Sequence, residues 1–129
     1  MPKLTADQVF QLAQSYHKFA RELGDYRFAE WDKLTAAERQ TLETKERLIR
    51  NFSSSFNGLS LKMELDALQG TLDKISKASA GMQKALKKLA TINKVLNVAA
   101  LIISLGTSVL TGNVNGIISG IDDVLTAFE

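Results

Sequence analysis

The sequence predicts an all-α protein, because apolar residues recur at helical spacing along most of the 129 residues. Residues that interrupt helices are few, with one Pro and eight Gly. The length and the 45% share of hydrophobic residues suit one domain with its own core. We therefore expect a single helical domain over residues 1–129. It should be an elongated antiparallel bundle with a long heptad-patterned central helix and an apolar C-terminal helical hairpin.

The first helix is expected over residues 5–30. Thr5 and Gln8 have the spacing of a capping box. Steps of three and four separate the apolar residues that follow, which places them on one helical face: Val9, Leu12, Tyr16, Phe19, Leu23 and Tyr26. Phe28 and Trp31 are expected to continue this apolar face.

A second amphipathic helix is expected over residues 35–56. Thr35 and Glu38 form another capping box at its start. The two amphipathic helices together account for residues 5–58, and an Asn-Gly turn ends this part of the chain.

A long basic amphipathic helix is expected over residues 60–94, with apolar residues in heptad register that continues to Ile103. This register defines a candidate assembly seam: Leu65, Leu68, Leu72, Ile75, Met82, Leu86, Leu89 and Asn93. A seam of this length needs a partner, either the first two helices or another protomer. Asn93 either fixes the register of that assembly or marks the end of the helix.

Charge is unevenly distributed along the chain. Residues 1–94 carry all 16 Lys and Arg and 11 of the 14 acids, whereas residues 95–129 carry only three acids. Five lysines occur in a stretch without any acid: Lys77, Lys84, Lys87, Lys88 and Lys94. A basic helix before an apolar segment is typical of an element whose lysines face anionic headgroups. A solvated helix that leads into a bundle core has the same pattern.

The last third of the chain lacks ionisable side chains for 27 consecutive residues, from Val95 to Ile121. We expect an apolar hairpin over residues 95–128, with arms at 96–110 and 114–128. Its candidate contacts with a membrane or a partner are Val98, Leu101, Ile102, Leu105, Val109, Leu110, Ile117, Ile118 and Ile121. A helix that crosses a bilayer needs about 20 residues. These shorter arms favour a hairpin that is sheltered in a soluble form and inserts after a trigger.

Three glycines in this hairpin recur every four residues: Gly112, Gly116 and Gly120. This spacing lets helix backbones approach closely in lipid. A turn at Gly112 with tight packing in a soluble bundle is the alternative.

The sequence lacks the residues that several classes of function require. The absence of Cys excludes disulfides and thiolate zinc sites, and a single histidine, His17, leaves no His cluster. No phosphate-binding loop or catalytic motif is present. The basic stretch has neither Arg nor aromatic residues for base stacking. We expect no enzymatic activity, cofactor, metal site, small-molecule substrate or nucleic-acid partner.

Two functions fit these patterns. The arrangement of a long helix before an apolar hairpin resembles, in outline, the α-helical pore-forming toxins, although it carries no motif specific to that group. The first function is therefore that of a membrane-active helical protein: a small pore-forming toxin, a toxin component, or a secreted translocator or effector. The alternative is a soluble, non-enzymatic module that oligomerises or binds a partner helix through its heptad seam.

Partners and location follow from the same two functions. The expected partners are a second copy of the chain, a helical protein or an anionic membrane. The N-terminus lacks the apolar segment of a secretory signal. We expect a cytoplasmic protein, or one secreted without a cleaved signal peptide, that associates with a membrane after a trigger.

Overall fold

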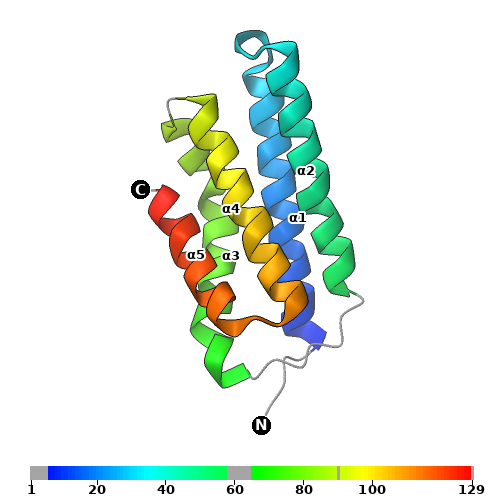
Figure 1. Cartoon of the computed structure of the whole chain (residues 1–129), viewed down its shortest axis with the longest axis vertical. Coiled ribbons are helices and arrows are strands. Elements are labelled where there is room, and N and C mark those ends of the chain that lie inside the picture. The colour runs from blue at the N-terminus through cyan, green and yellow to red at the C-terminus, as the bar shows by residue number, and fades with distance from the viewer. Residues whose placement is uncertain (1–5, 58–64, 90, 129) are drawn as a thin grey trace.

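A computed structural model describes residues 6–57, 65–89 and 91–128, with side chains for 8–56, 70–89 and 91–128. It contains five α-helices (Figure 1): α1 (Ala6–Ala29), α2 (Ala36–Asn57), α3 (Leu65–Lys88), α4 (Ile92–Thr111) and α5 (Val114–Phe128). A short 3₁₀ helix, Trp31–Lys33, lies between α1 and α2. The described residues contain no strand, which confirms the prediction of an all-α fold.

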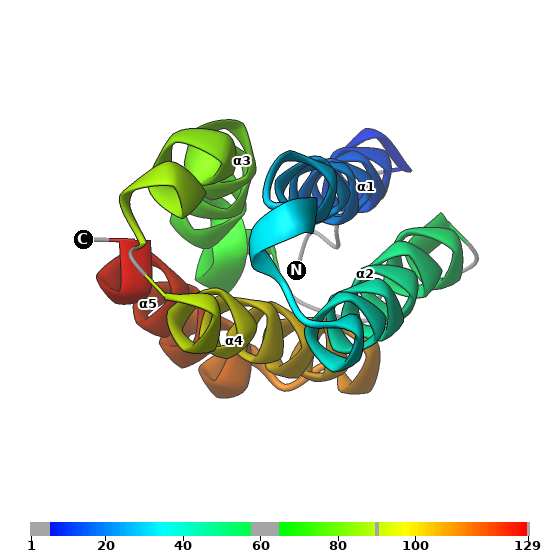
Figure 2. The same ribbon diagram turned by 90° about the horizontal axis from the view of Figure 1, so that it is seen from above.

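The five helices form a closed ring when the bundle is viewed from above (Figure 2). α1 packs against α2 and α3, α4 packs against α2 and α5, and α5 closes the ring by packing against α3. Each helix thus has two principal neighbours and turns its apolar stripe toward the centre.

The core lies inside this ring and receives side chains from every helix. Its largest fully buried members are Tyr16, Phe19, Leu23, Leu42, Ile49, Phe56, Ile75, Met82, Ile102, Leu105 and Ile117. Tyr16 is surrounded by three aromatic rings in edge-to-face geometry. The distances between its ring centroid and those of Phe19, Phe52 and Phe56 are 5.5, 5.8 and 4.9 Å. The first two helices therefore supply an aromatic centre around which the later helices pack.

The structure confirms some of the sequence predictions for the first two helices and contradicts others. The Thr35–Glu38 capping box is confirmed: the Glu38 N–H donates to Thr35 Oγ1 at 3.1 Å, and the Thr35 N–H donates to Glu38 Oε1 at 2.8 Å. The Thr5–Gln8 box involves a residue outside the described part. The expectation that Phe28 and Trp31 continue the apolar face of the first helix is wrong, since both side chains are exposed.

The predicted third helix, 60–94, and its boundary with the hairpin need correction. α3 ends at Lys88, and α4 begins at Ile92 rather than at residue 96. Thr91, with an extended backbone, separates the two helices, so the heptad register of the sequence crosses a chain reversal. Asn93 is exposed in the first turn of α4 and does not lie on the inner face of α3.

The other seam residues remain on α3. Ile75, Met82 and Leu86 are buried in the core, and Leu72 and Leu89 are half-buried against it. The side chains of Leu65 and Leu68 lie outside the described residues. α3 therefore turns its apolar residues toward α1 and α5 of the same chain.

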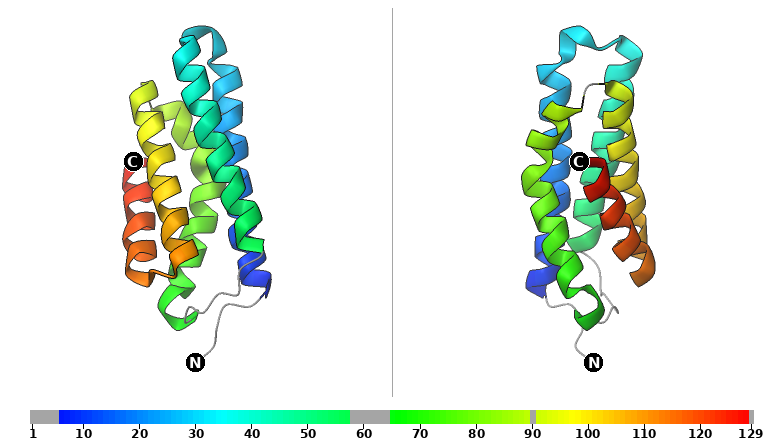
Figure 3. Two further views of the ribbon diagram at one scale, coloured as in Figure 1. Left: turned by 45° about the vertical axis from the view of Figure 1, so that its right-hand side comes forward. Right: turned by 90° about the vertical axis from the view of Figure 1, so that its left-hand side faces the viewer.

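Two ends of the bundle carry different connections (Figures 1 and 3). The α1–α2 connection, the C-terminal end of α3 and the N-terminal end of α4 lie at the end that is uppermost in Figure 1, called here the upper end. The α4–α5 turn lies at the opposite end.

Candidate functional site

Local signals define the hairpin formed by α4 and α5. The Thr91 side chain caps α4 by accepting a hydrogen bond from the Lys94 N–H at 3.4 Å. Gly112 ends α4 with a φ of 69°, a left-handed conformation that glycine adopts without steric cost. The Asn113 side chain accepts a hydrogen bond from the Gly116 N–H at 3.0 Å and so caps α5.

The predicted contact residues of the hairpin divide between its two sides. Six of them are buried against the rest of the ring: Val98, Ile102, Leu105, Val109, Ile117 and Ile121. Leu101 is half-buried. Leu110 and Ile118 are each 37% exposed. Most of the apolar residues of the hairpin are therefore sheltered inside the bundle.

The three predicted packing glycines have different environments. Gly112 forms the turn. A Cβ at Gly116 would lie 2.7 Å from the Ser108 Oγ, and one at Gly120 would lie 3.2 Å from the Leu105 Cδ1. Gly116 and Gly120 thus allow α5 to approach α4 closely within one chain.

The outer side of the hairpin is uncharged from Val95 to Ile121. Its exposed side chains and glycine are Asn97, Ala100, Ser104, Thr107, Leu110, Thr111, Gly112, Asn113, Asn115, Ile118 and Ser119. Exposed faces of the other helices carry charges, such as Arg21 in α1, Glu43 in α2 and Lys84 in α3. In the described part of the chain, α4 alone is long and apolar enough to cross a bilayer, and 39% of its apolar window is buried.

Few polar contacts attach the hairpin to the other three helices. The Tyr16 hydroxyl donates a hydrogen bond to the Ile102 carbonyl at 2.8 Å. Lys74 Nζ lies 3.5 Å from an Asp122 carboxylate oxygen on the exposed surface. These are the polar side-chain contacts between α1–α3 and α4–α5 among the described residues, so apolar packing supplies most of the attachment.

Phe52 of α2 packs against α4 at Gly106. Its ring lies against the backbone of Gly106, where a Cβ would be 2.9 Å from the nearest ring carbon. The ring is stacked on Phe56, with centroids 6.0 Å apart and an angle of 28° between the planes. The contact between Phe52 and Gly106 could not be predicted from the sequence, because nothing local indicates that these two positions meet.

The five predicted headgroup-facing lysines lie on two helices. Lys77, Lys84, Lys87 and Lys88 are exposed on α3, and Lys94 is exposed in the first turn of α4. None of them forms an ion pair with another described residue. Four of the five, all except Lys77, lie within five residues of the α3–α4 reversal, which the structure places at the upper end.

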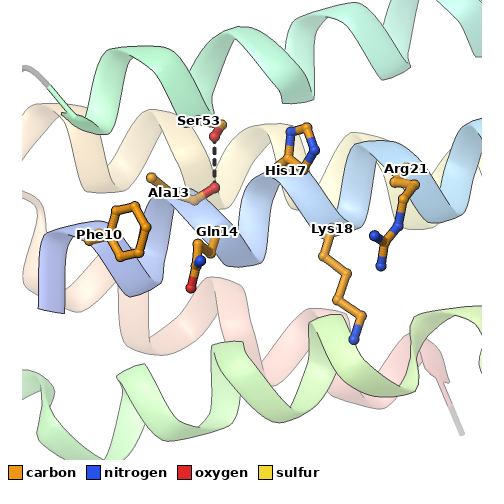
Figure 4. Close-up of a pocket in the computed structure, with 7 residues that line it drawn as sticks. All are labelled: Phe10, Ala13, Gln14, His17, Lys18, Arg21 and Ser53. Atoms are coloured by element: carbon orange, nitrogen blue, oxygen red, sulfur yellow. Dashed lines mark hydrogen bonds between the residues drawn. The ribbon is translucent and has the colours of Figure 1, made fainter. Parts of the chain in front are cut away.

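A second basic surface occurs on the middle of α1 (Figure 4). It is a shallow cleft of about 460 Å³ lined by Phe10, Ala13, Gln14, His17, Lys18, Arg21 and Ser53. Gln14, Lys18 and Arg21 extend to the same side of α1. The Ser53 hydroxyl donates to the Ala13 carbonyl at 2.7 Å. No acidic residue lines this cleft, so it adds positive charge to a second face of the bundle.

One carboxylate is buried between α1 and α2. Glu46 is 7% exposed and accepts hydrogen bonds from Arg27 at 3.1 Å and from Arg50 at 2.7 Å. Gly24 makes room for it, because a Cβ there would lie 2.8 Å from Glu46 Oε1. The two arginines compensate the buried charge, which is typical of a structural ion pair.

Comparisons with protein-family models, with curated proteins and with solved structures found no match to this chain. Within the described residues, no group of three His, Asp or Glu side chains is placed to hold a metal ion. The uncharged outer side of the α4–α5 hairpin and the exposed lysines near its start make this region the candidate functional site.

Proposed function

We propose that this protein is a membrane-active helical protein whose α4–α5 hairpin leaves the bundle and enters a bilayer. Such a protein would act as a small pore-forming toxin, a toxin component or a secreted translocator or effector. The observation that carries the proposal is the outer side of the hairpin, which is uncharged from Val95 to Ile121, between the exposed Lys94 and Asp122. A soluble helix normally exposes charged residues there.

The absence of charge lowers the cost of entering a bilayer. A charged side chain at the centre of a membrane-spanning helix costs about 2.5–3.5 kcal/mol or more. Two hydroxyls on the outer side of α4 already donate within the helix, Thr107 to the Ile103 carbonyl at 3.2 Å and Thr111 to the Thr107 carbonyl at 3.0 Å. These groups keep their hydrogen bonds when the helix moves into lipid.

The length of α4 also supports the proposal. Its 20 residues are five more than the predicted arm of residues 96–110, and at about 1.5 Å per residue they span about 30 Å. That length matches the hydrocarbon core of a bilayer, which is about 30 Å thick. α5 has 15 residues and is too short to cross alone, so we propose that it lies against α4 through Gly116 and Gly120.

The attachment of the hairpin suits its release. Lipid chains can replace the apolar contacts that hold the hairpin, whereas ion pairs and hydrogen bonds would be lost in lipid. Only the Tyr16–Ile102 hydrogen bond and the exposed Lys74–Asp122 pair join the two parts by polar side chains in the described residues. We further propose that the sheltered state is an elongated antiparallel bundle held together along the heptad seam. The hairpin leaves the bundle from this state.

A disulfide between α2 and α4 tests the release. Phe52 Cγ lies 3.0 Å from the position that a Gly106 Cβ would take. Since Cβ is about 1.5 Å from Cγ, the two Cβ atoms are at most about 4.5 Å apart, within the range that disulfides accept. The chain has no natural Cys, so Phe52→Cys/Gly106→Cys can form this cross-link alone.

The assay is dye release from anionic and neutral vesicles at neutral and mildly acidic pH. We expect the unmodified protein to release dye, the oxidised double variant to be inactive, and dithiothreitol to restore its activity. Phe52→Cys alone, which cannot cross-link within the chain, is the matched control and should release dye under both conditions. Release by the oxidised variant at the unmodified rate, or no release by the unmodified protein, would contradict the proposal.

The second candidate function is a soluble assembly module, favoured by the partial exposure of Leu110 and Ile118 on the two arms of the hairpin. These residues would then contact a second copy or a helical partner. Sedimentation of Leu110→Ser/Ile118→Ser distinguishes the two functions. Loss of an oligomer without any vesicle activity in the unmodified protein would favour the assembly module.

A further inference from the structure

Two aromatic rings are exposed at the upper end of the bundle, where α1 passes into the 3₁₀ helix. Phe28 is 66% exposed and Trp31 is 39% exposed. Their rings stack with centroids 6.0 Å apart and an angle of 11° between the planes. The Arg27 guanidinium lies 4.6 Å from the Phe28 centroid, and the Arg39 guanidinium lies 4.4 Å from the Trp31 centroid. We call these four residues the aromatic tip.

Polar contacts hold the aromatic tip in place. Arg39 donates from Nε and from its terminal nitrogen to the Trp31 carbonyl, at 2.9 and 2.6 Å. The Thr35–Glu38 capping box fixes the start of the next helix, and Leu34 between the two segments is buried. Although both rings are large and apolar, neither belongs to the core. An ordered, exposed aromatic pair of this kind is typical of a contact surface.

Unpaired lysines lie at the same end. Lys87 lines a small cavity together with Ala29 and three acids of α1, Glu22, Asp25 and Glu30, which places the end of α3 beside the end of α1 that carries the aromatic tip. Lys84, Lys88 and Lys94 are exposed near this point, on the last turns of α3 and the first turn of α4 (Figures 1 and 2).

Two acids at this end have partners and two do not. Glu30 pairs with Lys33 at 3.4 Å, and Glu38 accepts the hydrogen bond of the capping box, whereas Asp25 and Asp32 are exposed without an ion pair among the described residues. The four lysines have no ion-pair partner among the described residues, so their charge is free to meet an anionic surface.

We propose that the upper end is the surface with which the protein first docks onto an anionic bilayer. Phe28 and Trp31 enter the interface between headgroups and acyl chains, where aromatic side chains are favoured. The anionic headgroups then face four lysines, Lys84, Lys87, Lys88 and Lys94. Long-range electrostatic attraction between lysines and headgroups does not require a defined binding pocket. This inference rests on the proposed membrane activity and specifies its first step.

The position of α4 relative to the docked end determines what must happen before insertion. The charge-free segment begins at Val95, directly after Lys94, and therefore starts at the docked end. The α4–α5 turn lies at the far end of the bundle. Docking thus precedes insertion as a separate step, because the hairpin must still leave the ring for its turn to reach lipid.

Trp31 is the only tryptophan and reports directly on this step. The full chain is titrated with phosphatidylcholine vesicles that contain about one third phosphatidylserine. We expect the emission of Trp31 to shift to shorter wavelength and to be quenched by brominated acyl chains. The oxidised Phe52→Cys/Gly106→Cys variant should give the same shift without dye release, since docking does not need a free hairpin.

Charge variants identify the surface. Replacement of Lys84, Lys87, Lys88 and Lys94 by Gln removes four charges at the upper end. Each lysine near an anionic surface increases the affinity for vesicles about fivefold, so the loss of all four should weaken vesicle binding about 100-fold or more. The matched control removes four charges elsewhere, by Gln at Lys18, Arg21, Lys45 and Arg47, and should weaken binding less than 10-fold. Far-ultraviolet circular dichroism checks that both variants are folded.

Each outcome bears on the docking proposal separately from the hairpin. Dye release with unchanged Trp31 emission would overturn the docking surface and leave the hairpin proposal standing. Equal weakening by the two charge variants would also overturn it. No interaction with vesicles would end both proposals. A Trp31 shift that occurs on self-association without lipid would reassign the aromatic tip to a protein interface.

Discussion

Alanine substitutions at two helical glycines test the contact between Phe52 of α2 and Gly106 of α4. A Cβ added at Gly81, which is exposed in α3, meets no atom within 4 Å. A Cβ added at Gly106, which is buried in α4, lies 2.9, 3.0 and 3.1 Å from three ring carbons of Phe52. The same substitution therefore samples open space at one site and a packed aromatic ring at the other.

The two substitutions should change the free energy of unfolding in opposite directions. Replacing Gly by Ala inside a helix increases stability by about 1 kcal/mol, and Gly81→Ala should show most of this gain. At Gly106 the same gain is opposed by overpacking, which costs about 1–3 kcal/mol. The Phe52 ring has little freedom to move, because it packs against Tyr16 and Phe56. We expect Gly106→Ala to lower the free energy of unfolding by about 1 kcal/mol overall.

The assay is thermal and urea unfolding followed by far-ultraviolet circular dichroism. For a chain of this size, 1 kcal/mol corresponds to a change in Tm of about 3–5 °C. In a Phe52→Leu background the obstructing ring is gone, so Gly106→Ala should become neutral or stabilising. That difference corresponds to a coupling free energy of about 1 kcal/mol or more. An equal gain in Tm from Gly81→Ala and Gly106→Ala would refute the contact between α2 and α4.

Substitutions at three further positions test polar contacts. Burial raises the pKa of Tyr16 well above its ordinary value, so the unfolded state ionises first and stability should fall as pH rises above about 10. Tyr16→Phe should lower stability by about 1 kcal/mol at neutral pH and reduce that alkaline slope, both measured by urea unfolding. Glu46→Gln leaves Arg27 and Arg50 with weaker hydrogen bonds, and the midpoint of urea unfolding should report a loss of about 1–3 kcal/mol. Thr35→Ala removes a helix cap and should cost about 0.5–2 kcal/mol by thermal unfolding, whereas Thr35→Ser should cost little.

The positions of most helices followed from local signals in the sequence. The capping box at Thr35 and the helical spacing of apolar residues predicted α2 within one residue at each end. The sequence Thr111-Gly112-Asn113 predicted a turn before the last helix, whose predicted range 114–128 agrees with α5 in the structure. Helix caps and turns depend on contacts between residues that are close in the sequence. They can therefore be predicted from a single sequence.

Features that depend on distant residues could not be predicted in this way. The heptad register runs through Leu89–Thr91 without interruption, so nothing in the spacing of apolar residues indicates the reversal between α3 and α4. Thr91 was the available signal, since Thr is a common helix cap. Phe28 and Trp31 do not continue the three-and-four spacing of the apolar face. Phe28 lies two residues after Tyr26, on the opposite side of α1, and Trp31 follows the end of that helix, so both side chains are exposed.

Release of the hairpin, as we propose it, has a cost that constrains the mechanism. Opening the ring exposes the inner faces of α2 and α3, where Ile49, Phe56, Ile75 and Met82 are fully buried. At about 1.5–3 kcal/mol for each large apolar side chain, this exposure approaches the total stability of a typical domain, about 5–15 kcal/mol. The remaining three helices must therefore cover these faces with lipid or with another copy. Because α3 carries the heptad register, pairing between copies along α3 offers the cover, and insertion should coincide with oligomerisation. Cross-linking of docked protein before and after reduction of the Phe52→Cys/Gly106→Cys disulfide tests this coupling: oligomers that form equally with the hairpin locked would show that assembly does not depend on its release.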